Sequence, residues 1–443
     1  MKNNVMKSIV VLGVMTALTA CNGGPLFKAT KLLRNPEKCD HTISYEQKVE
    51  EGYIAFKDKL ETFSHKISES FVKKEFKDDK NITISPFSIE MCLGLAVRSA
   101  NNKTRQEILD PMGVDYATFN KYYRYFFNEN QFEHYSGYNQ LEGQLLVTNS
   151  IWIDDEISLY EETLDALRDD YYCYSYEADF NKNNQKTCKE MEKFISEKTK
   201  GLIKPNLEID PSTLFVLMNT LYLKDIWNDY GEDLNYADSK YTFTNYDKSV
   251  SKNRLLQGYY NNGRTLVTDD YSSFFTTTLN GFKLNFVKAN AGKKIEEVFD
   301  KDAMAFVMNP DNYIYKDDEK LERYHTNCVF PEYKADADLS LNEILIQDLG
   351  IISMFNPNVS DFSSISDQSV YVDDVRHIAK LEVNKKGIEG AAVTYMAMCG
   401  TSAPGPEEYK DIYETFVVDQ EFGFILSRND AVLFSGIVTN IDK

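Results

Sequence analysis

The chain has 443 residues, of which 42% are hydrophobic and 27% charged. These values are ordinary for a globular protein with a sizeable core. Its net charge is −20, and no long basic block interrupts this acidic balance, which argues against nucleic-acid binding. The length suits one large α+β unit without requiring two domains.

The N-terminus has the pattern of an export signal. Lys2 and Lys7 precede an apolar run over Ile9–Ala20, which is shorter than the ~20 residues that span a bilayer. The exit, Leu18-Thr19-Ala20-Cys21, resembles the lipobox of bacterial lipoproteins, in which the cysteine thiol carries diacylglycerol. We therefore expect a lipoprotein signal peptide over residues 1–20 and a membrane anchor at Cys21. A plain signal peptide with an incidental cysteine is the alternative.

An exported lipoprotein would lie in the bacterial cell envelope, on its surface or its periplasmic side. Residues 21–50 then form the lipid anchor and a tether without regular structure. No metal site or cofactor is expected, because the seven cysteines include no CxxC pair and their scatter does not resemble a zinc ligand set. Most of them are expected to be buried as small hydrophobes; they are Cys21, Cys39, Cys92, Cys173, Cys188, Cys328 and Cys399.

Helical and strand patterns alternate irregularly after the tether, which predicts an α+β fold. Helices are predicted over Phe56–Phe71, Ile89–Ala100 and Cys188–Lys200, with Gly201 as the C-terminal cap. Strands are predicted over Ile82–Ile84, Leu145–Ile153, Leu214–Leu223 and Ile378–Val383. A further strand-like segment covers Phe416–Leu426. At the C-terminus, Phe422–Leu426 and Val432–Ile437 are predicted to form a hairpin about Asn429-Asp430.

One stretch departs from globular patterning. Residues 387–406 read GIEGAAVTYMAMCGTSAPGP, with Glu389 as the only charged residue and no amphipathic period. The stretch lies between two strand-like segments. A connection longer than ~12–15 residues is uncommon and usually functional or disordered.

Six segments, in order, resemble motifs of the serpin family. They are NITISPFSI at 81–89, LMNTLYLKDIW at 217–227, DFSSIS at 361–366, YVDDVRH at 371–377, GIEGAAVT at 387–394 and FSGIV at 434–438. The resemblance implies one serpin domain over residues 51–443, with three β-sheets, about nine helices and an exposed reactive-centre loop at about 387–415.

The resemblance also implies a function, that of a suicide-substrate inhibitor of serine or papain-like cysteine proteases. A target protease attacks the loop and forms a covalent acyl-enzyme, and the freed half of the loop enters the main sheet as a new strand. The partners expected are therefore the target protease and, through Cys21, the membrane. The protein is expected to be a monomer without catalytic residues of its own.

The loop hinge matches the family motif at eight positions: Gly387, Ile388, Glu389, Gly390, Ala391, Ala392, Val393 and Thr394. Small, uncharged residues suit entry into a sheet, and Val393 and Thr394 favour strand, unlike a flexible Gly/Ser linker. Three residues depart from the family pattern. Ile388 replaces Thr or Ser, Gly390 replaces Ala, and Lys385 stands where Glu is usual, which puts the usual salt bridge at the top of the sheet in doubt.

The bond that the protease would cut lies, by the family's spacing, fourteen residues after the hinge glycine, at Thr401–Ser402. The loop is several residues longer than in familiar members, so Met398, Cys399 and Gly400 are alternatives. A small uncharged residue there suits proteases with small or apolar primary pockets.

A cluster that controls sheet opening is also implied by the resemblance. It comprises Ser85, Ser88, Asn219 and His377, with Trp227 at the top of the sheet. Taken alone, a single histidine is more often a satisfied core residue than a catalyst.

Two other functions are kept open. A catalytic function has no support in the sequence, because the chain has no P-loop, HExxH or GxSxG motif. A binding or storage lipoprotein with a serpin scaffold that does not inhibit is the stronger alternative, because fold does not determine function.

Overall fold

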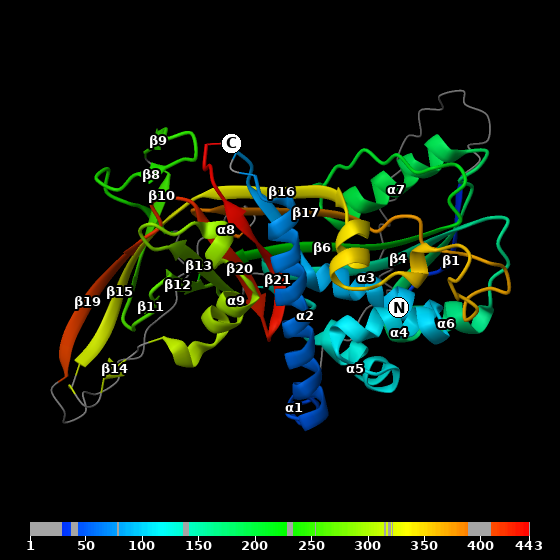
Figure 1. Cartoon of the computed structure of the whole chain (residues 1–443), viewed down its shortest axis with the longest axis horizontal. Coiled ribbons are helices and arrows are strands. Elements are labelled where there is room, and N and C mark those ends of the chain that lie inside the picture. The colour runs from blue at the N-terminus through cyan, green and yellow to red at the C-terminus, as the bar shows by residue number, and fades with distance from the viewer. Residues whose placement is uncertain are drawn as a thin grey trace, which may run out of the picture.

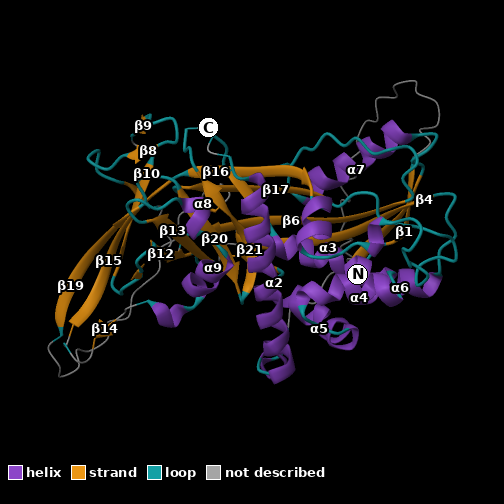
Figure 2. Cartoon of the chain, viewed as in Figure 1, coloured by secondary structure: helices purple, strands orange, loops and turns teal. Residues whose placement is uncertain are grey.

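The computed structural model describes residues 29–36, 43–77, 79–135, 141–227, 234–252, 254–313, 316–317, 320, 322–388 and 409–442. These residues form three large β-sheets with helices packed around them (Figure 1). The α+β prediction is confirmed. Figure 2 shows that the helices gather around the middle and one end of the molecule, whereas the other end is built of strands and loops. Within this part of the chain no helix is long and apolar enough to cross a membrane.

The α-helices of the described residues are α1 (Tyr45–Lys48), α2 (Glu51–Glu75), α3 (Pro86–Ser99), α4 (Asn102–Leu109), α5 (Tyr116–Glu129), α6 (Glu161–Tyr171), α7 (Asn184–Lys198), α8 (Ile295–Val298) and α9 (Lys301–Met308). The three predicted helices correspond to α2, α3 and α7. Ser85 caps the N-terminus of α3, where its side chain accepts a hydrogen bond from the Ser88 N–H and Pro86 begins the helix. Gly201 follows α7 with a positive φ of 81°, as predicted for a C-terminal cap.

The largest sheet has the strand order β1-β5-β4-β6-β18-β17-β16, with β3 paired to β4. Its strands are β1 (Thr30–Arg34), β3 (Phe132–Tyr135), β4 (Leu141–Asp154), β5 (Cys173–Ala178), β6 (Phe215–Ile226), β16 (Tyr333–Ser340), β17 (Arg376–Asn384) and β18 (Gly387–Ile388). In Figure 1 the long strands β4, β6, β16 and β17 of this sheet run from the middle of the molecule toward the end that holds α6 and α7.

A five-stranded sheet lies at one end of the molecule and comprises β7 (Asn235–Tyr236), β10 (Leu255–Tyr260), β14 (Lys316–Asp317), β15 (Glu322–Pro331) and β19 (Lys410–Val417). A six-stranded sheet comprises β2 (Ile82–Ile84), β11 (Thr265–Val267), β12 (Tyr271–Thr277), β13 (Lys283–Ala289), β20 (Phe422–Arg428) and β21 (Ala431–Val438). Strands β8 (Phe243–Thr244) and β9 (Val250–Ser251) form a small hairpin.

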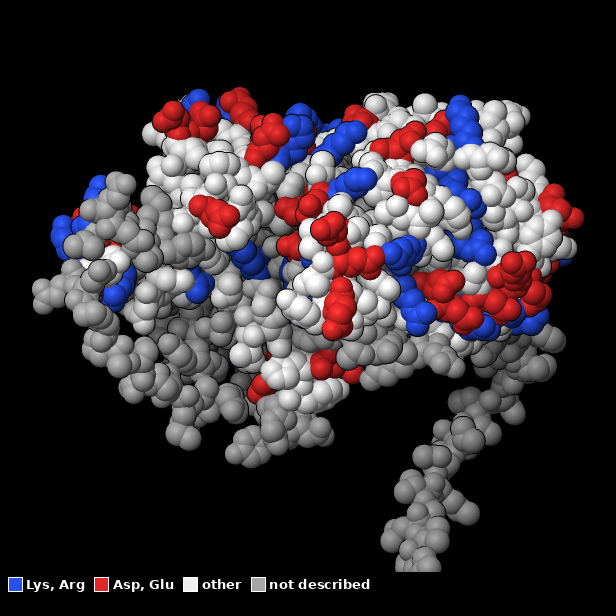
Figure 3. All heavy atoms as spheres, turned by 90° about the horizontal axis from the view of Figure 1, so that it is seen from below, with Lys and Arg blue, Asp and Glu red and all other residues white. Residues whose placement is uncertain are grey.

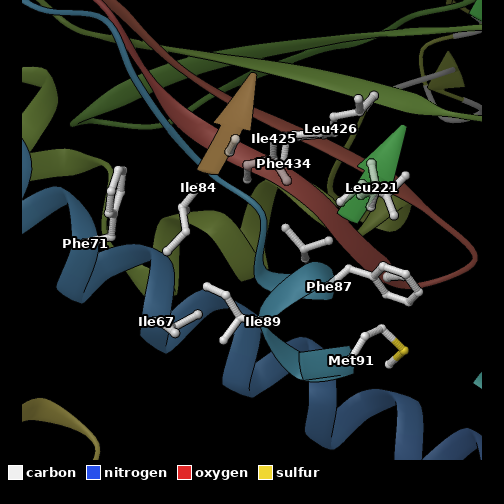
Figure 4. Close-up of a cluster of buried hydrophobic side chains, with 14 of the residues drawn as sticks. Ile67, Phe71, Ile84, Phe87, Ile89, Met91, Leu221, Ile425, Leu426 and Phe434 are labelled. Atoms are coloured by element: carbon white, nitrogen blue, oxygen red, sulfur yellow. The ribbon is translucent and has the colours of Figure 1, made fainter. Parts of the chain in front are cut away.

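The core is continuous from the six-stranded sheet to the long sheet. Figure 4 shows Ile67 and Phe71 of α2 and Phe87, Ile89 and Met91 of α3 beside residues of the sheets. All five are at most 2% exposed. These helices therefore cover β20 and β21 on one side and approach β6 on the other.

Three expectations need correction. The tether was predicted to lack regular structure, yet Thr30–Arg34 forms β1, antiparallel to β5, and Tyr45–Lys48 forms α1. The reactive-centre loop was placed at about 387–415, but β18 occupies 387–388 and β19 begins at Lys410, parallel to β15. The strand-like segment Phe416–Leu426 is split between β19 and β20. Pairing with partners distant in sequence decides β1 and β19, whereas α1 begins with a local capping box of Ser44 and Gln47.

Candidate functional site

The hinge begins inside the long sheet. After β17 the chain turns back through Lys385 and Lys386 and enters the gap between β17 and β6 as β18. Gly387 is paired with Asn384 on one side and Ile226 on the other, and Ile388 is paired with Val383 and Asp225. The first two hinge residues thus already form a short central strand.

Only glycine fits at position 387. Its φ is +151°, a conformation that residues with a Cβ rarely adopt. A Cβ there would also stand 2.0 Å from the carbonyl oxygen of Asp225. By contrast, Ile388 is fully buried beside Val383, so the departure from Thr or Ser is accommodated by the apolar core.

Beyond β18, no described strand lies between β6 and β17. Among the described residues, β6 and β17 are joined only through β18. A cavity of about 300 Å³ lies farther along this gap. Its walls include β6 residues 215–220, Arg376 and Ile378 of β17, and Met191 and Ile195 of α7, so α7 covers this part of the sheet.

The predicted sheet-opening residues come together beneath this gap. The Ser85 backbone N–H donates to Nε2 of His377 at 3.1 Å, and the Ser88 hydroxyl donates to Oδ1 of Asn219 at 2.5 Å. Asn219 in turn donates to Oδ1 of Asn149 at 2.8 Å. Hydrogen bonds therefore link β17 and α3, and separately α3, β6 and β4.

Sequence analysis missed Asn149. Its side-chain amide donates to the Tyr123 hydroxyl at 2.9 Å and to the Tyr171 carbonyl at 2.7 Å. A signal was present, because Asn149 is the one polar residue among the alternate inward positions Leu145, Val147, Ile151 and Ile153 of β4. A buried amide in that pattern indicates a hydrogen-bonded partner.

His377 is held neutral. Burial lowers the pKa of His377 to about 4, against a smaller opposing effect of the Asp338 carboxylate. The neutral ring can accept the Ser85 N–H bond, whereas an imidazolium, with both nitrogens protonated, cannot.

Trp227 lies at the Ile226 end of the gap between β6 and β17. Its indole N–H donates to the Asn384 carbonyl at 2.9 Å, and its ring packs edge-on against Phe330. It therefore contacts the last residue of β17, directly before the turn into β18.

A carboxylate not singled out from the sequence holds the same turn. Glu332 accepts a hydrogen bond from the Lys385 backbone N–H at 2.8 Å and from the Tyr236 hydroxyl at 3.4 Å. The Lys385 ammonium lies 5.5 Å from the Tyr236 ring centroid. Within the described chain Lys385 forms no ion pair, so the salt bridge that is usual in the family is absent at this residue. The Lys385 backbone bonds to Glu332 instead, and its ammonium makes a cation–π contact.

Other predicted residues cannot be placed. Hinge residues Glu389 to Thr394, the candidate reactive bonds at Met398 to Ser402, and Cys21 and Cys39 lie outside the described residues. Four cysteines that are described, Cys92, Cys173, Cys188 and Cys328, are buried, as predicted. No group of residues that could hold a metal ion occurs within the described ranges.

Comparison with known proteins agrees with this geometry. A family model described as serpin (serine protease inhibitor) matches residues 58–260 and 286–441. An uncharacterized serpin-like protein of Methanosarcina acetivorans is 25% identical over 392 residues, covering 83% of this chain and 82% of its own. The chain belongs to the serpin family, whose members are mainly protease inhibitors.

Solved structures show the same fold. Serpin48 of the insect Tenebrio molitor, described as a highly specific serpin, is 19% identical with a TM-score of 0.71, covering 88% of this chain and 98% of that one. Human thyroxine-binding globulin in complex with thyroxine is 17% identical with a TM-score of 0.71, covering 88% and 99%.

Proposed function

We propose that this protein is a suicide-substrate inhibitor of serine or papain-like cysteine proteases. The observation that carries the proposal is β18, a hinge whose first two residues already lie between β6 and β17. A noninserting loop has no need of a glycine that fits only against the Asp225 carbonyl, or of a gap that continues beyond it.

The register of β18 predicts where the following residues would go. Extended along the gap, it sets Gly390 between Leu223 and Leu381, and Ala392 between Leu221 and Ala379. Thr394 would lie between Asn219 and His377, in reach of the polar cluster. These neighbours belong to the inward face of the sheet, and the residues that would meet them are small and uncharged.

The loop residues that alternate with Gly390, Ala392 and Thr394 carry the larger and charged side chains. In the same register Glu389, Ala391, Val393 and Tyr395 would face outward, with Glu389 between Lys224 and Glu382. Residues 393–397 would pass β6 residues 216–220, which line the 300 Å³ cavity. The period-two partition of the loop therefore matches the two faces of the gap.

The resemblance to serpins implies the chemical steps of the proposed trap. The hydroxyl or thiol of the protease attacks the carbonyl carbon of Thr401, the bond to Ser402 breaks, and the amine of Ser402 leaves with a proton. The ester or thioester that remains joins the protease to the loop. Insertion from Ile226 to Phe215 would carry the enzyme roughly 36 Å along β6, and distortion of its active site would prevent deacylation. Met398, Cys399 and Gly400 remain alternative sites for the cut.

A lipid anchor on Cys21 is a further part of the proposal. Ala29 precedes β1 at the Phe215 end of the sheet, since Thr30 pairs with Ala178, Ala178 with Asp154, and Ile153 with Phe215. The hinge is at the opposite end, where Gly387 pairs with Ile226. An anchored molecule would present its loop away from the membrane, and insertion would move the protease toward the anchored end.

The anchored end of the molecule has no uniform charge. Arg34 of β1 forms ion pairs with Asp165 and Glu161 of α6, and Figure 3 shows acidic and basic side chains interspersed over the face seen from below. The anchor is therefore assigned to lipid rather than to electrostatic attraction. A Cys21→Ser variant should leave the membrane fraction, and an unchanged distribution would contradict lipid anchoring.

The inhibitory trap is tested with the full chain purified in detergent. It is mixed with elastase, subtilisin and papain, and denaturing gels are examined for a higher-mass, denaturant-stable band. Mass spectrometry of the released C-terminal peptide identifies the cut bond. Clean cleavage with every enzyme and no such band would overturn the proposal.

A matched pair of variants tests the register. Ala392→Glu places a carboxylate on the inward face and should convert the inhibitor into a substrate, because burial of an unpaired charge opposes insertion. Ala391→Glu places the same group outward near Lys380 and should retain the trap. Equal behaviour of both variants would contradict the register.

The second candidate is a binding protein that does not inhibit; thyroxine-binding globulin, solved in complex with thyroxine, shows that this fold can hold a small ligand. Loop cleavage separates the two functions. An inserting serpin should become much more heat-stable after cleavage, whereas a noninserting one should melt as before.

A further inference from the structure

Two tyrosines stand exposed on the outer face of the five-stranded sheet. Tyr413 of β19 is 66% exposed and Tyr259 of β10 is 50% exposed. Their rings are stacked, with centroids 6.5 Å apart and planes 25° from parallel. We call these two residues the tyrosine pair.

The pair is held in place by its neighbours. The His325 ring stacks on Tyr413 at 4.8 Å, with planes 17° apart, and Nε2 of His325 is 2.8 Å from the Asp411 carboxylate. Alongside, Gln257 donates to Asn327 at 2.8 Å. Rings fixed before binding lose little conformational entropy when a partner covers them.

We propose that the tyrosine pair is a docking surface for the target protease, engaged while the protease active site holds the loop. This inference rests on the proposed function. Exposed aromatic rings with a hydroxyl at the tip are enriched at protein interfaces and among the residues that dominate binding energy. The occupant is the target protease, because β19 directly follows the loop that the protease would bind.

The number of residues between the cut bond and β19 limits how far the protease can lie from this sheet. A cut at Thr401–Ser402 leaves eight residues before Lys410, which span at most about 29 Å. A protease domain of about 220 residues has a radius of roughly 22 Å. An enzyme seated on the loop is therefore within reach of β19, and Tyr413 lies only three residues beyond Lys410.

The contact would be temporary. Loop insertion carries the protease roughly 36 Å along β6, away from the five-stranded sheet. The tyrosine pair should therefore raise the rate of association and leave the final covalent complex unchanged. Since both rings are uncharged, this contribution should depend only weakly on salt.

The test compares Tyr259→Ala, Tyr413→Ala and the double variant with Tyr45→Ala, a matched control. Tyr45 is 75% exposed on α1, far along the chain from the loop. The full chain is assayed in detergent against elastase, subtilisin and papain, and three quantities are measured: the second-order rate of inhibition, the number of inhibitor molecules consumed per enzyme, and the melting temperature.

The double variant should associate about tenfold more slowly with at least one enzyme, with unchanged stoichiometry and melting temperature. Tyr45→Ala should match the parent. Tyr413→Phe, which keeps the ring, should recover most of the rate. Equal rates for the double variant and the parent with every enzyme would overturn the docking surface.

Failure of the trap itself would be seen separately. If the parent forms no stable complex, the rate of loop cleavage replaces the rate of inhibition. A tenfold slower cleavage of the double variant would still support docking, and an equal cleavage rate would overturn it.

Discussion

The Nε2 atom of His377 accepts the backbone N–H of Ser85 at 3.1 Å, which joins β17 to the first residue before α3. This bond exists only for the neutral ring. Because β17 borders the gap that the loop would enter, the protonation state of one buried histidine is coupled to the closure of the sheet.

Acid should therefore weaken the closure of the sheet and favour premature entry of the loop. The pKa of His377 is lowered to about 4 from an ordinary value near 6.5, so the stability that the neutral ring contributes is complete above pH 6.5. It is lost as pH falls toward 4, and it amounts to about 3 kcal/mol at most. The half-life of inhibitory activity should shorten steadily between pH 6.5 and 4.

His65 provides the control for this prediction. Burial also lowers the pKa of His65 to about 4, but its Nε2 lies 3.2 Å from the sulfur of Met308, between α2 and α9. His377→Gln should flatten the pH dependence of the inhibitory half-life, whereas His65→Gln should alter only the pH dependence of global unfolding. Identical profiles for both variants would contradict a specific role for His377.

Replacement of Gly387 should expel the hinge from the sheet. In Gly387→Ala the methyl group meets the Asp225 carbonyl oxygen, so β18 should separate and inhibition should shift toward simple cleavage. Urea unfolding should show a loss of about 1–3 kcal/mol. Gly281→Ala is the control, since its φ is also positive but nothing lies within 4 Å of a Cβ. It should cost about 1 kcal/mol and leave inhibition intact.

Loss of the Glu332 carboxylate should loosen the turn before the hinge. Glu332→Ala leaves the Lys385 N–H without its acceptor, at a cost of about 1–3 kcal/mol. Spontaneous inactivation at 37 °C should become severalfold faster. Glu343→Ala, which removes an exposed ion pair with Lys74, should change stability by less than about 1 kcal/mol, and equal effects would argue against a special role of Glu332.

A buried glutamate should make the protein more stable at lower pH. Burial raises the pKa of Glu90 well above its ordinary value, although its Oε1 accepts a hydrogen bond from Ser64 at 2.6 Å. A raised pKa means that the folded state binds the proton more tightly, so this contribution is present at low pH and lost as pH rises. Glu90→Gln should raise the melting temperature more at pH 8 than at pH 5, and a uniform shift would contradict a neutral Glu90.

The helices and strands with strong local signals were predictable. The apolar period of α2, the Ser-Pro start of α3 and the Asn429-Asp430 turn all act over a few residues. So does the composition of the hinge, since small residues at alternate positions are visible without knowing the partner strand. The strand β1 could not be predicted, because it exists only through pairing with β5, about 145 residues away.

The sequence by itself determined the family and indicated that Ser85, Ser88, Asn219 and His377 belong to one polar cluster. Only the tertiary structure decided that Gly387 and Ile388 already lie between β6 and β17, that Asn149 extends the polar cluster, and that Glu332 holds the turn at Lys385. The physical reason is that each of these features depends on a contact between segments distant in the sequence: Lys385 and Glu332 are 53 residues apart, Asn149 and Asn219 are 70 apart, and Gly387 and Ile226 are 161 apart. Their geometry depends on how three sheets pack together, and no local periodicity of the chain encodes that packing.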